Sequence, residues 1–422
     1  SIISPLIILL VFLFWFIRYN YSEENYMEYK IEIEKMDHFG RGIGKINNKI
    51  IFVPHTVKGD IVVVKIVKDK KKFYEGEVIQ YSKKTPRIKL CPYSNVCGGC
   101  SFIDIDYKEQ LKIKIEKIKD LFQKELGISI EIEEVISDSN TNYRNKIRLH
   151  GKNKKLGFYK EKTNDLVTID ECIISKDEIN SIMKRLNLII DNNMDEVIIR
   201  SNKEVMLDIK GSISKDIVLH HFKDIDTIYL NDFLIKGKGY ITEDILGKTF
   251  MISNKSFFQV NTKICSKIFS KILNYLKTKN YHKALDLYCG VGVIGILISD
   301  YIDKVIGIEV IDTAIQDANQ NKKLNKVNNI DFICDKVENR IHEFQDIDLI
   351  VVDPPRSGLD KKSLSSIIKM NPETIIYISC NPNTLIRDLK EMLIRYKIEN
   401  FFMADMFPNT YHVECVALLG RK

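Results

Sequence analysis

The chain has 422 residues, of which 45% are hydrophobic and 29% are charged, as in an ordinary globular protein. This length supports two or three domains, and nine cysteines in so long a chain exclude a small disulfide-stapled scaffold. The formal net charge of +7 permits nucleic-acid binding without demonstrating it.

An unbroken apolar run from Leu6 to Ile17 lies near the start of the chain. It is shorter than the roughly 20 residues that cross a bilayer, and neither a preceding basic residue nor a small-residue cleavage site accompanies it. Met27 stands directly before the first segment with a folded pattern. We expect residues 1–26 to be a hydrophobic leader outside the folded protein, from a misplaced start, with a membrane anchor as the alternative.

Residues 28–86 alternate short strands with glycine turns, which is typical of a small closed barrel of the oligonucleotide-binding type. Four lysines between positions 68 and 72 lie beside Phe73 and Tyr74, a mixture that suits phosphate contact and base stacking. A solvated hairpin tip would have the same composition. The expected strands, apart from the glycine-rich stretch 40–44, cover 29–35, 50–53, 60–68 and 73–80.

Three cysteines lie within ten residues, in Cys91-Pro-Tyr-Ser-Asn-Val-Cys97-Gly-Gly-Cys100, and Cys172 follows much later. The two glycines let the backbone curl, and four thiolates could hold zinc or an iron–sulfur cluster. The unequal spacing and the distant fourth ligand favour a 4Fe–4S cluster over a zinc ribbon, which uses two matched Cys-x-x-Cys pairs.

A Lys-lined helix is expected over 107–124, followed by mixed α and β structure to about 250. Within it, the stretch from Asn142 to Arg148 is a basic strand edge that could guide RNA, although a plain exposed strand would look the same. We therefore expect a central α+β domain over 87–262 that carries the four cysteines.

From about residue 263 helices and strands alternate, which predicts a doubly wound, Rossmann-like parallel sheet over 263–422. Gly290, Gly292 and Gly295 form a Gly-x-Gly-x-x-Gly loop directly after the strand 283–288. About 20 residues on, Glu309 ends a second strand, where it could bind ribose hydroxyls. NAD is the default ligand of such a loop.

Two acids shift the expectation from NAD to S-adenosylmethionine. Asp286 lies ahead of the glycines, where it could meet the amino-acid end of that cofactor. Asp335 ends a third strand, where it could meet the adenine amino group.

Three further strand ends carry chemical groups. A fourth strand ends on Asp353, before Pro354, Pro355 and Arg356. The β-branched and aromatic stretch 374–378 predicts a buried parallel strand that ends near Cys380, and a helix is expected from Asn383. The positive end of that helix could favour the Cys380 thiolate.

Glu414 lies in the otherwise apolar strand 413–419, where a carboxylate is costly unless it is paired or catalytic. A nucleophilic thiol and a desolvated carboxylate beside S-adenosylmethionine suit methylation of uracil at carbon 5. Thiolate attack on carbon 6 activates carbon 5, and a base must then remove the carbon-5 proton. Cys380 and Glu414 fit these two roles.

From Met27 to Lys422 the chain resembles the RNA uracil-5-methyltransferases. The residues that carry the resemblance are Ser256-Phe-Phe-Gln259-Val-Asn261, the loop from Asp286 to Gly292, Asp353-Pro-Pro-Arg356, Ser379-Cys-Asn-Pro382 and Thr410-x-His-Val-Glu414.

The resemblance implies a multi-domain α/β protein: an N-terminal oligonucleotide-binding-like TRAM barrel over 27–86, the central iron–sulfur domain and a C-terminal class I methyltransferase domain. It implies that Cys380 is the nucleophile and Glu414 the base. The implied site of S-adenosylmethionine is lined by Gln259, Tyr288, Glu309 and Asp353, and the implied ligands of a 4Fe–4S cluster are Cys91, Cys97, Cys100 and Cys172. Because methyl transfer moves no net electrons, the cluster is expected to be structural or to support RNA binding.

The cysteines and the barrel are similar to the branch of the family that acts on 23S ribosomal RNA. We therefore expect a cytoplasmic RNA-binding enzyme with no DNA substrate, no obligate protein partner and no membrane attachment. The alternatives are the same chemistry on tRNA, a nucleobase amino-group methyltransferase, which usually has an aromatic residue where this chain has Arg356, and a non-catalytic RNA-binding module.

Overall fold

A computed structural model describes residues 27–94, 96–132, 134–161, 163–189 and 193–422. The apolar leader predicted over 1–26 lies outside these ranges. The chain divides into two compact units, one ending at Pro86 and the other running from Arg87 to Lys422. Among the helices in the described ranges, none is long and apolar enough to cross a membrane.

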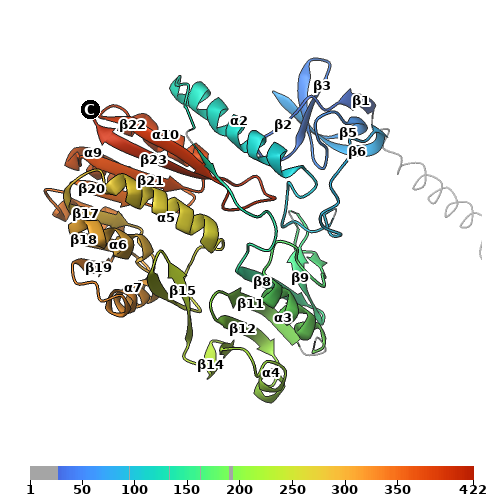
Figure 1. Ribbon diagram of the computed structural model, residues 1–422. Helices are drawn as coiled ribbons and strands as arrows, with labels where there is room; N and C mark the ends of the chain where they lie inside the picture. The colour runs from blue at the N-terminus through green and yellow to red at the C-terminus, as the bar shows by residue number, and fades with distance from the viewer. Residues whose placement is uncertain (1–26, 95, 133, 162, 190–192) are drawn as a thin grey trace, which may run out of the picture. The chain divides into compact units, whose positions relative to one another are not determined.

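The first unit is one six-stranded sheet with the order β1-β5-β6-β4-β3-β2. Its outer strands, β1 and β2, are joined by only two residues, so the sheet curls back on itself (Figure 1). Isoleucine and valine side chains fill the interior. The strands are β1 (Glu28–Glu32), β2 (Lys35–Met36), β3 (Gly42–Ile46), β4 (Lys49–Val53), β5 (Ile61–Lys70) and β6 (Phe73–Lys83).

The glycine-rich stretch is more than a break between strands, because β3 begins inside it. A Cβ on Gly42 would lie 2.0 Å from Thr56 Oγ1, so only glycine lets the chain approach here. The predicted lysine cluster lies at the β5–β6 hairpin, next to Phe73, which packs on Phe52, and Tyr74, whose ring faces Lys49.

The second unit contains a seven-stranded sheet with the order β10-β9-β8-β11-β12-β13-β14. Two helices, α3 (Asp177–Asn187) and α4 (Lys215–His221), contribute to the core on one of its faces. A separate hairpin, β15 (Tyr240–Ile245) and β16 (Lys248–Ser253), follows the sheet. The strands of the sheet are β8 (Lys146–Lys152), β9 (Lys155–Tyr159), β10 (Leu166–Val167), β11 (Asn193–Ser201), β12 (Val205–Ser212), β13 (Thr227–Leu230) and β14 (Phe233–Lys236).

An eight-stranded sheet with the order β19-β18-β17-β20-β21-β23-β22-β7 forms the C-terminal part. The five strands β17 to β21 are parallel, as predicted, but β23 runs antiparallel to both of its neighbours, so the prediction of a wholly parallel sheet is wrong. The strands are β7 (Val135–Ile136), β17 (Tyr281–Leu287), β18 (Ile302–Glu309), β19 (Ile330–Cys334), β20 (Leu349–Val352), β21 (Thr374–Ser379), β22 (Tyr396–Ala404) and β23 (Glu414–Arg421).

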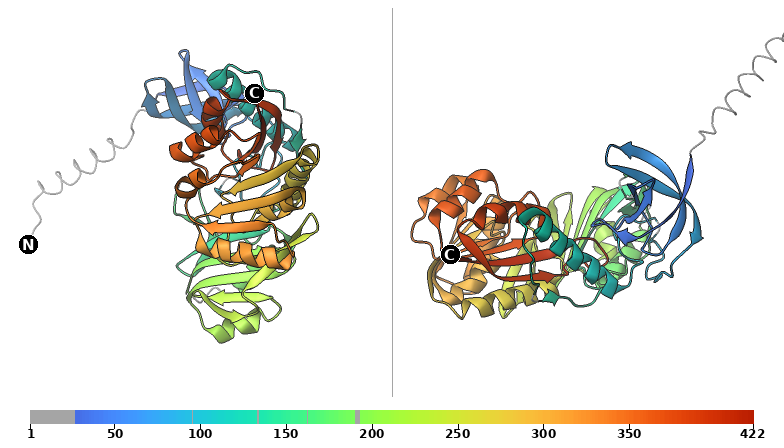
Figure 2. Two further views of the ribbon diagram at one scale, coloured as in Figure 1. Left: turned by 90° about the vertical axis from the view of Figure 1, so that its left-hand side faces the viewer. Right: turned by 90° about the horizontal axis from the view of Figure 1, so that it is seen from above.

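Helices cover both faces of this sheet (Figures 1 and 2). One hydrophobic core packs the sheet against α5 (Thr262–Leu276), α6 (Val293–Ile298) and α7 (Asp312–Leu324). The other packs it against α2 (Tyr107–Leu126), α8 (Val337–Arg340), α9 (Lys361–Met370) and α10 (Pro382–Met392). On β21, Ile376 and Ile378 face the first core, whereas Ile375 and Tyr377 face the second.

Segments that precede residue 263 also pack on or pair with the eight-stranded sheet. Helix α2 packs in its second core through Ile118 and Phe122, and β7 pairs with the end of β22. The hairpin β15–β16 packs in the first core. The boundary between central and methyltransferase domains at 262/263 therefore stays a prediction based on order along the chain.

Candidate active site

Residue parity on three neighbouring strands places the predicted chemical groups on one face of the sheet. Side chains two residues apart along a strand point to the same face of the sheet. Asp353 lies two residues after Val351, Cys380 two after Ile378, and Glu414 two before Val416. Val351, Ile378 and Val416 all lie in the core shared with α5 and α6. Asp353, Cys380 and Glu414 are thus directed to the same side of the sheet.

The strand register brings the thiol and the carboxylate together. β21 and β23 are antiparallel neighbours, and Ser379 lies opposite Cys415. The next position therefore sets Cys380 beside Glu414. Asp353 joins them from β20, whose last residue, Val352, pairs with Tyr377 of β21.

Burial dominates the electrostatics of this group. Glu414 is only 5% exposed, and burial, followed by the charge of Asp353, raises its pKa well above the usual value. Burial also raises the pKa of Asp353 to about 7. The pKa of the Cys380 thiol is raised to about 11 by burial and then by Glu414 and Asp353.

The Cys380 pKa is raised because burial, Glu414 and Asp353 outweigh the lowering effects of Arg356 and a backbone hydrogen bond. Helix α10 begins at Pro382, which has no N–H group, and the Asn381 side chain accepts the hydrogen bond of the Asn383 N–H. That the positive end of this helix favours the thiolate stays a prediction.

Arg356 is the charged group whose role the sequence analysis missed. Its charge favours the ionised forms of Cys380 and Glu414 and so lowers the pKa of both groups. Its main-chain oxygen accepts a hydrogen bond of 2.8 Å from Asn381 Nδ2, which ties the loop after β20 to the residue after Cys380. Its position directly after Pro354 and Pro355, at the end of a strand that carries Asp353, is the sequence feature that could have indicated this role.

Cys265, on α5, is a second group that was missed. It is buried, and burial together with Asp353 and Glu414 raises the pKa of its thiol. It therefore lies across from these carboxyl groups, on the helix that covers this face of the sheet.

Two acids beside the glycine loop, Asp286 on β17 and Glu309 at the end of β18, have different surroundings. Asp286 is buried; its Oδ2 accepts the Gly295 N–H at 2.8 Å, its Oδ1 has no hydrogen-bond partner, and burial raises its pKa to about 8. Glu309 accepts the N–H of Gly290 at 3.2 Å through Oε2. A Cβ on Gly290 would meet nothing within 4 Å, so this side of the loop is open.

Three other predicted cofactor residues are Tyr288, next to this loop, Asp335, after it in the chain, and Gln259, before it. Tyr288 has a φ of +63°, an unusual conformation for a tyrosine, directly after β17. Asp335 is exposed, and hydrogen bonds from Asn339 and the Lys336 N–H lower its pKa. Gln259 is placed through its main-chain oxygen, which accepts from Asn145 Nδ2 at 3.1 Å.

The four predicted cluster cysteines come near one another without forming a metal site. Among the described residues, no group of three or more His, Cys, Asp or Glu side chains is arranged to hold a metal ion. Nevertheless, partial burial raises the pKa of the Cys100 thiol, and Cys172, Cys97 and Cys91 raise it further, so the four side chains lie within electrostatic reach.

Hydrogen bonds hold both cysteine segments in place. Asp170, two residues before Cys172, donates its N–H to the Tyr93 hydroxyl at 3.2 Å. The Asn180 side chain accepts the Cys172 N–H and donates to its carbonyl. The donor set and its support therefore suit a thiolate-bound group, although the sulfur atoms are not in a ligating arrangement.

A cavity of about 520 Å³ lies elsewhere, at the edge of β22, and includes none of the predicted site residues. The site is thus defined by strand ends and charge, not by this hollow.

The chain is similar to known RNA methyltransferases. A family model of tRNA (uracil-5-)-methyltransferases matches residues 226–422, and a TRAM domain model matches residues 25–79. An RNA methyltransferase of Clostridium tetani is 33% identical over 440 residues, which cover 93% of this chain and 96% of that protein. One of Staphylococcus aureus is 31% identical, with coverage of 92% and 96%.

The chain belongs to the RNA uracil-5-methyltransferase family. A crystal structure of Pyrococcus abyssi tRNA (uracil-54, C5)-methyltransferase, in complex with S-adenosyl-L-homocysteine, has a TM-score of 0.76 and 26% identity, and it covers 93% of this chain and all of that one. The protein is thus an S-adenosylmethionine-dependent RNA methyltransferase with an N-terminal TRAM domain and a Rossmann-like methyltransferase fold.

The electrostatics of the site predict two substitutions with opposite effects on the Cys380 thiol. Glu414→Gln removes a negative charge and should lower the Cys380 pKa below about 11, whereas Arg356→Met removes the favourable cation and should raise it. The alkylation rate of Cys380 by iodoacetamide, followed against pH by peptide mass spectrometry, measures both shifts. Because a raised pKa leaves little thiolate near neutral pH, Glu414→Gln should alkylate faster at pH 8 and Arg356→Met more slowly.

The exposed Asp335→Asn variant is the control and should leave the profile unchanged. Equal profiles for all the variants would contradict the placement of Glu414 and Arg356 beside Cys380.

Proposed function

We propose that the enzyme methylates carbon 5 of a uridine in 23S ribosomal RNA, with Cys380 as nucleophile and Glu414 as general base. The observation that carries this proposal is the cross-strand placement of a half-buried thiol beside a buried carboxyl group, at the edge of the sheet to which Asp353 also belongs. A carboxyl group is costly at position 414 unless it is paired or catalytic, because β23 is apolar from Cys415 to Leu419.

The chemistry begins at the sulfur atom of Cys380. The thiol loses its proton to solvent, and the thiolate forms a bond to carbon 6 of uracil while the carbon 5–carbon 6 double bond shifts to an enolate. Carbon 5 then takes the methyl group that S-adenosylmethionine supplies. Glu414 removes the carbon-5 proton, the double bond re-forms, and the bond from sulfur to carbon 6 breaks.

The perturbed pKa values suit these steps. A raised pKa makes Glu414 a stronger base once it is ionised, and Arg356 promotes that ionisation. A raised pKa likewise gives a more nucleophilic Cys380 thiolate, although a scarcer one at neutral pH. The raised pKa values therefore make the ionised forms of Cys380 and Glu414 more reactive and reduce the fraction of each group that is ionised at neutral pH.

We assign the cofactor site to the open edge around the glycine loop. Supporting this are the unpartnered Oδ1 of Asp286 and the open side of Gly290. In this assignment Glu309 faces the ribose and Asp335 the adenine. Gln259, Tyr288 and Asp353 complete the pocket around the methyl group.

The four cysteines Cys91, Cys97, Cys100 and Cys172 are assigned to a 4Fe–4S cluster within the central domain, 87–262. Their support is the convergence of four thiols from two segments that are braced by Tyr93 and Asn180. Such a cluster would cross-link the segment near residue 95 to the segment near residue 172.

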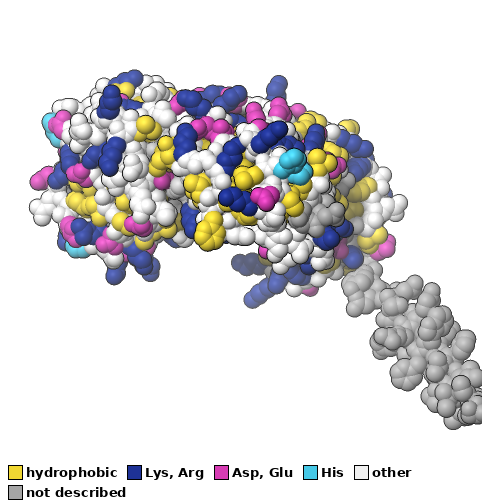
Figure 3. All heavy atoms as spheres, turned by 90° about the horizontal axis from the view of Figure 1, so that it is seen from below, with side chains coloured by type: hydrophobic (Ala, Val, Ile, Leu, Met, Phe, Trp, Pro, Cys, Tyr) yellow, Lys and Arg dark blue, Asp and Glu magenta, His cyan; other side chains and the backbone are white. Residues whose placement is uncertain are grey.

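The substrate is RNA, and we propose 23S ribosomal RNA as the specific target. The TRAM domain over 27–86, in this proposal a barrel of the oligonucleotide-binding type, would provide sequence-independent grip in the cytoplasm through its cationic hairpin. On the face that Figure 3 shows, Lys and Arg side chains are interspersed with Asp and Glu.

A tRNA uridine is the second candidate. The Pyrococcus abyssi relative is a tRNA (uracil-54, C5)-methyltransferase and covers 93% of this chain, so an N-terminal domain ahead of the methyltransferase part does not separate the two substrates.

Two active-site variants should separate the two chemical roles. Cys380→Ala should abolish methyl transfer and covalent RNA adducts, because no sulfur atom remains to attack carbon 6. Glu414→Gln should form the adduct and fail to release it, slowing turnover by roughly 10²–10⁴-fold, the range expected for loss of a general base. Denaturing gels of enzyme with labelled RNA measure the adduct, and methyl transfer in Cys380→Ala would overturn the mechanism.

The substrate is identified by mass mapping of 5-methyluridine in total RNA from cells with and without the gene. A single 23S position should lose its methyl group. Loss in tRNA instead would keep the chemistry and replace the target, and an unchanged map would reject uracil methylation in favour of an amino-group methyltransferase or a binding module.

The cluster assignment predicts iron and acid-labile sulfide in protein purified without oxygen. Cys100→Ser should reduce both and the associated visible absorbance, whereas Cys334→Ser, at an exposed cysteine outside the set, should not. Zinc in place of iron, or no metal in the unmodified protein, would refute the assignment.

A further inference from the structure

A loop over residues 405–413, here named the base loop, connects β22 to β23 and ends directly at Glu414. Ala404, the residue before the loop, pairs with Glu414, the residue after it. Glu414 is thus held by its pairing with β22, and the base loop sets the path by which the chain enters β23. Most of the loop is buried, including Asp405, Met406, Asn409 and Val413.

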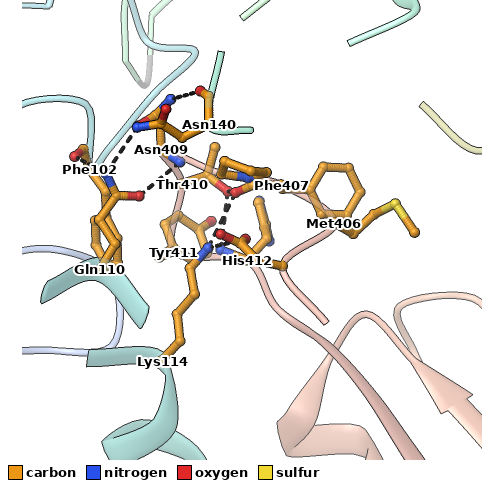
Figure 4. Close-up of polar contacts among 12 residues, drawn as sticks. Phe102, Gln110, Lys114, Asn140, Met406, Phe407, Asn409, Thr410, Tyr411 and His412 are labelled. Carbon is orange, nitrogen blue, oxygen red and sulfur yellow. Dashed lines mark hydrogen bonds and ion pairs between the residues drawn. The ribbon is translucent and has the colours of Figure 1, made fainter. Parts of the chain in front are cut away.

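The side-chain amide of Gln110, on α2, holds the base loop through Asn409. Gln110 Oε1 accepts the Asn409 N–H at 2.9 Å, and Gln110 Nε2 lies 3.0 Å from Asn409 Oδ1 (Figure 4). The same Nε2 lies 3.0 Å from the carbonyl oxygens of Phe102 and Ile105. Gln110 is fully buried, so each of these contacts is costly to lose.

A buried ion pair one helical turn later adds a second attachment. Lys114 Nζ lies 2.7 Å from Asp405 Oδ1 and 3.3 Å from the carbonyl oxygen of Phe407, and both charged side chains are at most 1% exposed. Removing one partner of such a pair leaves an uncompensated buried charge. The start of the base loop is thus fixed to α2.

The segment that follows the cysteines completes the clamp. The Phe102 N–H donates to the Asn409 carbonyl at 2.9 Å, and the Tyr411 N–H donates to Ser101 Oγ at 3.1 Å. Ser101 directly follows Cys100. The base loop is therefore hydrogen-bonded to the chain immediately beside the cysteine segment.

We propose that the segment from Ser101 to Lys114 is a positioning clamp that sets Glu414 for proton removal, and hence for release of methylated RNA from Cys380. The inference rests on the proposed function and adds Gln110 and Asn409 as positioning residues. Within the described residues, none of these hydrogen bonds of the clamp reaches β21 or the start of α10, the two elements on either side of Cys380. Loosening the clamp thus displaces the base relative to the nucleophile.

Two variants test the clamp from its two sides. Asn409 has a φ of +65°, so Asn409→Gly keeps the backbone conformation while removing the side-chain contacts to Gln110 and Asn140. Gln110→Met keeps similar volume and removes the amide. In single-turnover reactions with total RNA from cells lacking the gene, both should form the adduct at the native rate.

Release of that adduct should slow by up to about 100-fold, as for a catalytic group displaced by about 1 Å. In the double variant the slowing should be smaller than the product of the two single effects, because both substitutions break the side-chain contact between Gln110 and Asn409.

Phe122→Leu is the matched control. It lies on the same helix, is equally buried and packs on Phe401 at a ring distance of 5.0 Å, away from the base loop. It should lower the melting temperature without changing the ratio of adduct to released product. If the clamp variants slow adduct formation and release equally, they act by general destabilisation and the inference is wrong.

The inference and the proposed function fail differently. If Glu414→Gln accumulates adduct while Gln110→Met and Asn409→Gly release product at the native rate, only the clamp is refuted. If native enzyme and Glu414→Gln form no adduct at all, the proposed function itself is refuted.

Discussion

Burial of ionisable groups on one face of one sheet edge is the constraint on which this site depends. The two-residue alternation of β20, β21 and β23 directs Asp353, Cys380 and Glu414 into the side of the sheet that α5 and α6 cover. Burial there penalises the charged form of every one of them. The cation that favours ionisation of the thiol and Glu414, Arg356, is exposed, so the penalty is only partly relieved. Such an arrangement lowers stability and raises the reactivity of the ionised groups.

Local patterns in the sequence predicted most of the elements but not their long-range pairing. The apolar stretches of β20 and β21 and the helices α2 and α5 could be predicted because their periodicity lies within a few residues. The reversal of β23 could not, since an apolar strand has no direction of its own. The raised pKa of Cys380 could not be predicted either, because it comes first from burial in the folded sheet and then from Glu414, a neighbour 34 positions away in the chain.

For a related reason, the order of segments along the chain did not show where α2 and β7 pack. The apolar face of α2, with Ile118 and Phe122, predicts that the helix is packed, but not on which sheet. The structure packs it on the C-terminal sheet, although it lies some 150 positions before that sheet's first parallel strand. The buried Gln110 and Lys114 on this helix then gain a meaning that the sequence did not give them, because their partners, Asn409 and Asp405, come from the other end of the chain.

The reversed strand also explains why Cys380 and Glu414, the proposed nucleophile and base, reach the site from different segments. Cys380 lies between the last residue of β21 and the capped start of α10. Because β23 is antiparallel, it presents its first residue, Glu414, at this edge, where Glu414 pairs with Ala404 at the end of β22. The chain enters β23 from the base loop, which α2 holds through Gln110 and Lys114. The surroundings of Glu414 therefore include side chains of α2 that hold the base loop, whereas β21 and α10 flank Cys380, so the proposal of separate control over the two groups has a structural basis.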